Sequence, residues 1–394
     1  MAKKTKKSQT AFIMPLFIII FVLLYGGLHF YMFYKARTAL AFSTSTSFFV
    51  LLFMLVMVFA PILVRLSEKW GSELATSLIA YVGYTWMGIL ALFFCTSIVI
   101  DLLRFLVYLG GLISQRDFSS ITHLTPYYFF APLLLSILIT TYGYFEARNI
   151  HTERVTIKTA KIPPEIGQLK IVQISDIHLG VLVGEERLKK ILEEVKKANP
   201  DILVSTGDLV DGEMCNIEGL IRLLKEVNPR YGKFAVTGNH EFYAGMDKAL
   251  DFTRNAGFTV LRGEERTVAG GGNVAGVDDP AGKPFGVHNQ RSEKKLLSSL
   301  PPGNFTLFLK HRPVVNKDAV GFFDLQLSGH AHKGQIFPFS LITRLYYPID
   351  EGYIKLESGS YLCVSKGAGT WGPPIRFMAP PDIVVIELIP EERH

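Results

Sequence analysis

Long apolar runs fill the first 147 residues of this 394-residue chain and constrain its fold more than any other feature. About 20 apolar residues are enough to cross a bilayer as a helix, which satisfies its own backbone hydrogen bonds. Apolar residues 102–113 are too few for a separate span and are expected to continue the third helix. The four predicted spans are about 11–34, 47–64, 74–100 and 127–144. We therefore predict a transmembrane anchor over residues 1–147 and a globular domain over 150–394.

The amino terminus also has the order of a secretory signal, in which a basic segment precedes an apolar core. The basic residues are Lys3, Lys4, Lys6 and Lys7. The apolar run that follows is long enough to span, further spans succeed it, and no small-residue cleavage site is evident. An anchor is therefore favoured over a signal peptide.

The positions of Lys and Arg predict the orientation, because these residues accumulate on the cytoplasmic side. With the amino terminus inside, that side carries Lys3, Lys4, Lys6, Lys7, Arg65, Lys69, Arg148, Arg154, Lys158 and Lys161. The opposite loops carry only Lys35, Arg37, Arg104 and Arg116. We expect a multi-pass protein of the inner membrane with a cytoplasmic domain, whereas three or five spans would place the domain outside.

Few ionisable residues interrupt the predicted spans. His29 is the one expected within a span, and Asp101 and Arg104 are expected near a helix end, where a charged group reaches water at low cost. We therefore interpret the helices as an anchor, with the bilayer as a partner, and not as a transporter. The alternative is that these helices also bind lipid.

Charge and cysteine content argue against a nucleic-acid-binding protein and against a protein stabilised by disulfides. The formal net charge is +6, but beyond the amino terminus the basic residues are scattered. No basic stripe alternates with aromatic residues, so no nucleic-acid partner is expected. The three cysteines, Cys95, Cys215 and Cys363, have no CxxC spacing, so a disulfide framework is not expected.

Beyond residue 150, apolar strands alternate with amphipathic helices. The first strand–helix pairs are 169–175 with 185–198, 202–206 with 217–227, and 233–236 with 245–256. Later strands are predicted at 273–277, 305–309, 325–328, 361–365 and 383–388, with fewer helices between them. Strand–helix units followed by a strand-rich half predict a layered α/β domain with a mixed sheet.

Polar residues recur where these strands end, which is where open α/β sheets bind ligands. In chain order they are Asp176 and His178, Asp208 and Asp211, Asn239, His240 and Glu241, His311, and His330 and His332. Carboxylates, imidazoles and one amide without cysteine suit Mn, Fe, Zn, Co or Ni. Two such ions about 3.5–4 Å apart would clamp the attacking and leaving oxygens of an in-line displacement at phosphorus. Two aspartates cannot balance two dications, so one carboxylate and a solvent hydroxide are expected to bridge them.

The ordered motifs Asp176-x-His178, Gly207-Asp208-x-x-Asp211, Gly238-Asn239-His240-Glu241, His311 and Gly329-His330-x-His332 resemble the calcineurin-like metallophosphoesterase superfamily. The resemblance covers about residues 168–389. The glycine-rich run 364–376 further resembles the membrane-associated bacterial branch that includes UDP-2,3-diacylglucosamine hydrolase-like proteins. This resemblance implies a four-layer α/β/β/α domain built from two mixed sheets flanked by helices.

The same resemblance implies a role for each motif residue. One divalent metal ion would be held by Asp176, His178, Asp208 and His332. The second would be held by Asp208 as the bridge, with Asn239, His311 and His330. His240 would be catalytic without binding metal: it would protonate the leaving group or steady the phosphoryl oxygens. Asp211 and Glu241 would orient the imidazole rings without binding metal themselves.

Two segments bear on the substrate. Asp278 and Asp279 either face the cleft or form a turn after a strand. The apolar stretch 336–347 either packs in the core or forms a lip beside the metals that docks on the bilayer or receives an acyl chain.

We expect a membrane-anchored two-metal hydrolase in which a metal-bridging hydroxide attacks a phosphodiester or pyrophosphate, with a lipid-linked substrate as one option. The alternative is a membrane protein whose metal site senses or scaffolds without turnover. The complete ligand set and His240 favour the enzyme. The sequence predicts neither which metal is bound nor the oligomeric state.

Overall fold

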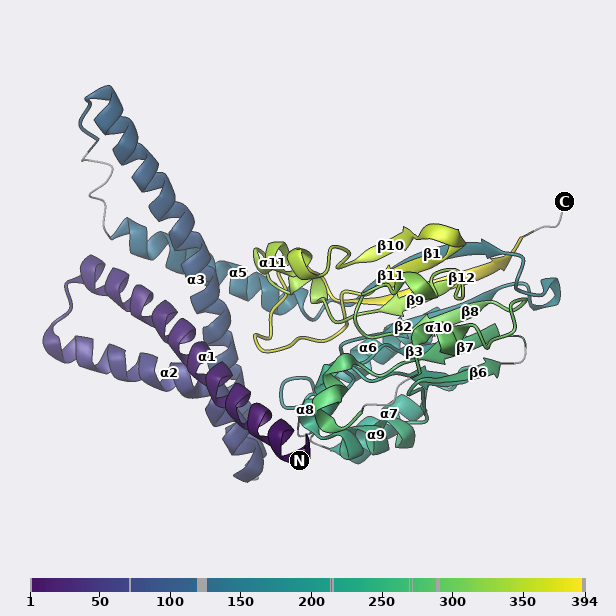
Figure 1. Ribbon diagram of the computed structural model, residues 1–394. Coiled ribbons are helices and arrows are strands. Elements are labelled where there is room, and N and C mark those ends of the chain that lie inside the picture. The colour runs from purple at the N-terminus through teal and green to yellow at the C-terminus, as the bar shows by residue number, and fades with distance from the viewer. Residues whose placement is uncertain are drawn as a thin grey trace. The chain divides into compact units, whose positions relative to one another are not determined.

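The computed structural model describes residues 2–70, 72–118, 126–212, 214, 216–268, 270, 272–287 and 291–391 (Figure 1). The chain divides into two compact units, which are described separately. The first contains Met1–Tyr144 with Gly372–Ile375, and the second contains Phe145–Trp371 with Arg376–His394.

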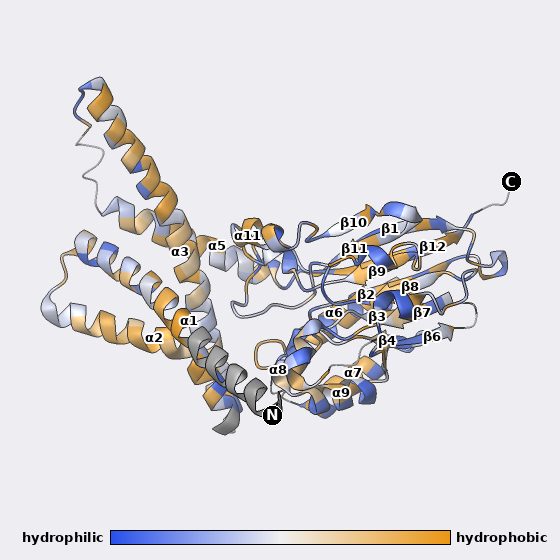
Figure 2. Cartoon of the chain, in the orientation of Figure 1, coloured by the Kyte–Doolittle hydropathy of each residue, from blue (hydrophilic) through white to orange (hydrophobic). Residues whose placement is uncertain are grey.

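The first unit is built from long helices in which apolar side chains predominate (Figure 2). They are α1 (Ala2–Leu40), α2 (Thr44–Trp70), α3 (Glu73–Ser114) and α5 (Tyr127–Glu146). The stretches long and apolar enough to cross a membrane are Ile19–Leu40, Thr44–Glu68, Glu73–Ser114 and Tyr127–Glu146. As predicted, residues 102–113 continue the third helix, whose 42 residues reach about 63 Å at ~1.5 Å per residue.

One histidine and one carboxylate side chain within these helices have polar partners on a neighbouring helix. His29 is buried, its Nδ1 lies 2.8 Å from the carbonyl oxygen of Tyr25, and its Nε2 accepts a 2.9 Å hydrogen bond from Trp86. The prediction that Asp101 and Arg104 lie near a helix end is wrong, because α3 continues without a break to Ser114. Asp101 instead forms a 2.8 Å ion pair with Lys35 of α1.

The second unit contains two six-stranded sheets. The first has the order β1 (His151–Thr159), β12 (Asp382–Pro390), β2 (Leu169–Ile174), β3 (Ile202–Ser205), β4 (Lys233–Ala235) and β5 (Thr259–Val260). The second has the order β10 (Gly352–Lys355), β11 (Tyr361–Val364), β9 (Leu325–Ser328), β8 (Thr306–Leu309), β7 (Gly272–Gly276) and β6 (Glu264–Val268). Pairs β12–β2, β6–β7 and β10–β11 are antiparallel and the other pairs are parallel, so both sheets are mixed, as predicted.

Three apolar cores join these sheets and helices into four layers. Inward-facing residues of the two sheets, such as Ile171 and Leu307, pack against each other. The outer face of the first sheet packs on α6 (Glu185–Ala198), α7 (Ile217–Lys225) and α9 (Met246–Asn255). The outer face of the second sheet packs on α10 (Glu293–Leu297). The predicted α/β/β/α architecture is therefore confirmed.

The amphipathic pattern explains why the predicted helices form. In α6, Leu188, Ile191, Leu192 and Val195 recur at helical spacing and are all buried. The helix predicted at 245–256 is confirmed as α9. Gly245, with a φ of 108°, separates α9 from the preceding helix α8 (Asn239–Ala244), which was not predicted.

Several short elements were not predicted. They include β1, β5, β6, β10 and α11 (Phe339–Tyr346), with 3₁₀ turns at Pro164–Ile166, Pro280–Phe285, Lys317–Ala319, His332–Gly334 and Glu357–Gly359. Strand β1 pairs in parallel with β12, from the far end of the domain's sequence. Cys95 and Cys363 are free thiols, and Cys215 lies outside the described residues.

Candidate metal centre

Strands of both sheets deliver the predicted site residues to one place. The loops after β2 and β3 carry Asp176 and His178, and Asp208 and Asp211, while the first turn of α8, which follows β4, carries Asn239, His240 and Glu241. The segments after β8 and β9 carry His311, His330 and His332. Backbone hydrogen bonds tie these loops together, from Asp176 N to Gly207 O and from His178 N to Asp208 O, each 3.0 Å. Parallel neighbouring strands end at the same sheet edge, so residues distant in sequence become neighbours.

Five of these residues adopt the left-handed backbone conformation that side chains other than glycine rarely take. Their φ values are 52° for Asp176, 57° for His178, 52° for Asp208, 70° for His330 and 48° for His332. Such conformations cost about 1–3 kcal/mol each and persist where the surroundings impose them, typically at functional sites. Here they turn the side chains toward a common centre.

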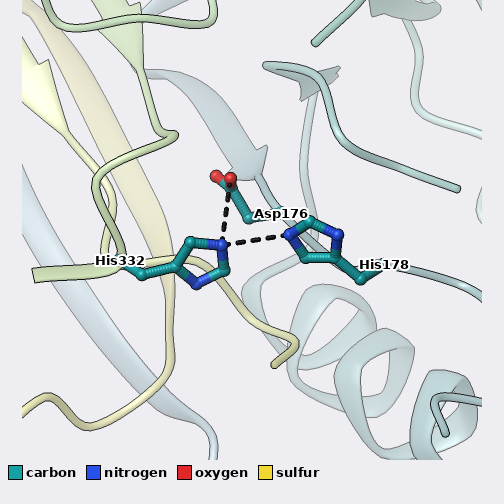
Figure 3. A group of neighbouring side chains, drawn as sticks. All are labelled: Asp176, His178 and His332. Atoms are coloured by element: carbon teal, nitrogen blue, oxygen red, sulfur yellow. Dashed lines mark hydrogen bonds and ion pairs between the residues drawn. The ribbon is translucent and has the colours of Figure 1, made fainter. Parts of the chain in front are cut away.

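Asp176, His178 and His332 form the first group (Figure 3). The Nε2 atoms of His178 and His332 lie 3.0 Å apart, and His332 Nε2 lies 3.3 Å from Asp176 Oδ1. All three residues are buried, with at most 9% of their surface exposed. Two imidazole nitrogens and a carboxylate oxygen that converge at this range form a set of donors for a transition metal.

Asp208 joins a second group to the first. Its Oδ2 lies 3.2 Å from His311 Nε2 and 3.9 Å from His178 Nε2. His311 Nε2 in turn lies 3.1 Å from His330 Nδ1, and Asp208, His311 and His330 have donor atoms close enough for one ion. A third such group combines His178, Asp208 and His240. Asp208 thus has the position that a bridging carboxylate requires.

Asn239 supplies the clearest test of whether a cation fits. Its side-chain oxygen is buried and has no hydrogen-bond partner among the described residues. A buried polar atom left unsatisfied costs about 1–3 kcal/mol, so such atoms need an explanation. A metal ion bound by the amide oxygen would satisfy it, and the donor set beside it is of the type that holds one.

Protonation of the histidines also suits metal binding. Burial lowers the pKa of His178 to about 3, and burial with the charge of His311 lowers that of His330 to about 4, so both rings are neutral at pH 7. Burial opposes the charge of His311, but Asp208 outweighs it and raises this pKa to about 10. A divalent cation between His311 and Asp208 would take the place of that proton.

His240 is held by Asp211. Its Nδ1 lies 2.8 Å from Asp211 Oδ1, and its backbone N–H donates to Asp208 Oδ1 at 2.8 Å. The other carboxylate oxygen of Asp211 lies 3.9 Å from His178 Nδ1, too far for a hydrogen bond, and this buried nitrogen has no hydrogen-bond partner among the described residues. Burial lowers the pKa of His240, but the hydrogen bond that its ring donates to Asp211 and the charge of nearby carboxylates outweigh burial and raise this pKa above its ordinary value.

Glu241 binds backbone groups, whereas it was expected to orient imidazole rings. Its carboxylate accepts backbone N–H groups of Gly238 and Leu209 at 2.7 Å and of Asp208 at 3.1 Å. It therefore holds the loops after β3 and β4 together and orients backbone, not imidazoles. Burial and the charge of Asp208 raise the pKa of Glu241 to about 7.

Comparison with known proteins identifies the family. A family model described as calcineurin-like phosphoesterase matches residues 169–334. An uncharacterised metallophosphoesterase of Aquifex aeolicus is 41% identical over 257 residues, covering 65% of this chain and 98% of the relative. The chain belongs to the calcineurin-like phosphoesterases.

Two further relatives extend into the helical unit. A metallophosphoesterase of Campylobacter jejuni is 32% identical over 317 residues, covering 78% of this chain and 83% of the relative. A protein of Danio rerio named as a transmembrane protein with a metallophosphoesterase domain is 28% identical over 348 residues, covering 83% and 79%. With the apolar helices, the Danio rerio relative indicates that this calcineurin-like phosphoesterase associates with a membrane.

Family membership confirms the expected activity class and cofactors. This phosphoesterase is a metal-dependent hydrolase of phosphoesters, and its cofactors are two divalent metal ions. The clustered Asp and His residues and the unsatisfied oxygen of Asn239 fit that requirement.

Arg376 is part of the site but had no role in the sequence interpretation. It is fully buried and donates to the carbonyl oxygens of Gly369, Lys366 and Gly367 at 2.6, 2.8 and 3.1 Å. It also donates to His332 Nδ1 at 2.9 Å, so it positions that ring. Burial lowers the pKa of Arg376 to about 10. The only signal in the sequence was its place at the end of the glycine-rich run 364–376.

The sequence left two interpretations open for residues 278–279 and two for the apolar stretch 336–347, and the structure bears on both segments. Asp278 and Asp279 are buried and bound by arginines: Arg262 contacts Asp278 at 2.9 Å and Arg312 contacts Asp279 at 2.7 Å. Asp279 also caps the following turn, which supports the turn interpretation. Helix α11, by contrast, contains no buried residue, so the core interpretation of this part of the apolar stretch is wrong.

Proposed function

We propose that the chain hydrolyses a phosphodiester or pyrophosphate bond at this centre. One metal ion would be held by Asp176, His178, Asp208 and His332, and the other by Asp208, Asn239, His311 and His330. When bound, such a pair supplies positive charge and lowers the pKa of coordinated water. The observation that carries the assignment is Asp208, whose Oδ2 lies 3.2 and 3.9 Å from ligand nitrogens of the two groups.

His240 is proposed as the catalytic residue that protonates the leaving oxygen. Because Nδ1 is engaged by Asp211, Nε2 is the ring nitrogen that can face a substrate. The raised pKa favours the protonated ring, which a general acid needs. Asp211 stays in place and holds the ring, while Glu241 fixes the loops that carry Asp208 and His240.

A lipid-linked substrate is supported by the apolar surface that follows the last site residue. Leu341, Ile342, Leu345 and Tyr346 of α11 expose 57%, 54%, 81% and 77% of their surfaces. Tyr347 directly follows α11, and its ring lies 5.2 Å from the ring of His330, so this end of the helix lies beside the metal centre. An exposed apolar helix beside a reaction centre is suited to a substrate with acyl chains or to a bilayer surface.

The lipid-linked proposal is tested by replacing Leu345 and Tyr346 together with Ser. We expect KM for a lipid-linked pyrophosphate in mixed micelles to rise about tenfold, since two large apolar groups are lost. Hydrolysis of bis(p-nitrophenyl) phosphate should not change. The matched control is Ile217→Ser, which removes a 45% exposed side chain from α7. Equal losses on both substrates would contradict the proposal.

We also propose that the helices cross the inner membrane four times and leave the hydrolase domain in the cytoplasm. The distribution of Lys and Arg among the loops supports this orientation. A carboxyl-terminal green fluorescent protein should then be fluorescent and a carboxyl-terminal alkaline phosphatase inactive. The opposite pair of results would place the domain outside.

A further inference from the structure

A cluster of charged and phenolic side chains lies among the apolar helices of the first unit. Asp101 of α3 binds Lys35 Nζ at 2.8 Å and accepts a 2.6 Å hydrogen bond from the Tyr31 hydroxyl, both from α1. Arg104 lies one turn further along α3, 3.6 Å from Asp101, and its guanidinium stacks 4.0 Å from the ring centre of Tyr128. Three helices therefore contribute to the cluster.

The cluster lies on turns of α3 whose other side chains are apolar and exposed. Leu102, Phe105 and Leu106 on the same turns of α3 expose 56%, 53% and 53% of their surfaces, as lipid-facing residues do. Ionisable side chains on apolar membrane helices are rare and mark candidate sites for ligands. Anchoring alone does not require Asp101, Lys35 and Arg104.

Helix lengths indicate the depth of the cluster. Lys35 lies within about 8 Å of the end of α1 at Leu40, because a helix rises ~1.5 Å per residue. Asp101 lies about 42 Å along α3 from Glu73, more than the ~30 Å hydrocarbon core. Both distances place the cluster near one face of the membrane, at the level of the lipid head groups.

The cluster surrounds a cavity of about 500 Å³, within the range of small-molecule sites. Its polar lining includes Tyr31, Lys35, Thr38, Asp101, Arg104 and Tyr108. Two cations share one carboxylate, so the lining has a net charge of +1. The exposed fractions of the Lys35, Asp101 and Arg104 side chains are 10%, 34% and 32%, so all three are partly shielded from solvent.

We propose that this cavity binds the phosphate group of an anionic phospholipid. Lys35 and Arg104 would contact the phosphate oxygens, for which charge-assisted hydrogen bonds are well suited. Tyr31 and Asp101 hold Lys35, and the aromatic side chains face the glycerol and upper acyl region, as they do at membrane interfaces. This site is separate from the metal centre and does not depend on the proposed reaction.

The test is a titration of the purified full-length chain with its metals, in uncharged detergent. Binding is followed through Tm as phosphatidylglycerol, phosphatidylcholine or sodium phosphate is added. We expect phosphatidylglycerol to bind at least about tenfold more tightly than either comparison, because only it combines a head group of net negative charge with lipid chains. Equal responses to the three additions would overturn the proposal.

Two substitutions break the same ion pair with opposite expected effects. Lys35→Gln makes the lining neutral and should weaken binding of phosphatidylglycerol about tenfold. Asp101→Asn makes the lining more positive and should preserve or strengthen that binding. The matched control is Arg37→Gln, which removes an exposed charge from the same helix turn and should change nothing. If the Lys35–Asp101 pair served only to hold α1 against α3, both substitutions would weaken binding equally, and that result would overturn the proposal.

Discussion

The Nδ1 atom of His240 lies 2.8 Å from Oδ1 of Asp211, while the other oxygen of Asp211 lies 3.9 Å from His178 Nδ1. Asp211 is thus hydrogen-bonded to the proposed catalytic histidine and lies beside the ring of a proposed metal ligand without bonding to it. Its removal should alter the protonation of His240 as well as its orientation, and the two effects can be separated.

The Asp211–His240 contact predicts a change in the pH profile. Burial alone would lower the pKa of His240. The hydrogen bond to Asp211 and the nearby carboxylates outweigh burial, so this pKa lies above its ordinary value. A general acid is active below its pKa, so activity should fall as pH rises through that value. Asp211→Asn removes the raising charge and should move the alkaline limb of kcat/KM to lower pH. Asp247→Asn, an exposed carboxylate of α9, should leave the limb in place, and an unmoved limb in Asp211→Asn would contradict the assignment.

Replacing Asn239 with Ala should have opposite effects in the presence and absence of metal. With metal, we expect bound ions to fall from about two toward about one per chain, measured by elemental analysis after dialysis. Without metal, the variant should be no less stable to urea than the parent, because an unsatisfied buried oxygen that costs about 1–3 kcal/mol is removed. The control Asn255→Ala, at an exposed position, should change neither. Unchanged metal content in Asn239→Ala would remove Asn239 from the ligand set.

Arg376 should not be replaceable by Lys. Lysine keeps the charge but lacks the planar fork that reaches three carbonyl oxygens and His332 together. We expect Arg376→Lys to lower the free energy of unfolding by about 2–4 kcal/mol and to weaken binding of the first metal. The exposed Arg254→Lys should stay within about 0.5 kcal/mol of the parent. A stable variant with full metal content would show that Arg376 does not position His332.

Local sequence patterns predicted much of the fold, because the spacing of apolar residues reflects which side chains of a helix or strand are buried. The helical spacing of Leu188, Ile191, Leu192 and Val195 is sufficient to predict α6 with the ends observed. The alternation of strands with helices predicted that strand ends would meet, and the structure brings Asp208, His311 and His330 together accordingly.

The features that the sequence did not predict depend on partners distant in the chain. Strand β1 is stabilised by pairing with β12, and Arg376 binds a ring 44 residues away. Lys35 and Asp101 are separated by 66 residues, so their pairing cannot be read from either helix alone. Glu241 was misinterpreted for a related reason, because its partners are backbone N–H groups, which carry no sequence signal.

The most direct test of the central claim is turnover of bis(p-nitrophenyl) phosphate by purified full-length protein loaded with Mn²⁺, compared with the metal-stripped protein and with His240→Asn. We predict that removal of metal abolishes turnover. His240→Asn should lower kcat by about 10²–10⁴ while its metal content stays at the parent value. Turnover that survives in the metal-stripped protein, or that is unchanged in His240→Asn, would contradict a two-metal hydrolase with His240 as its acid.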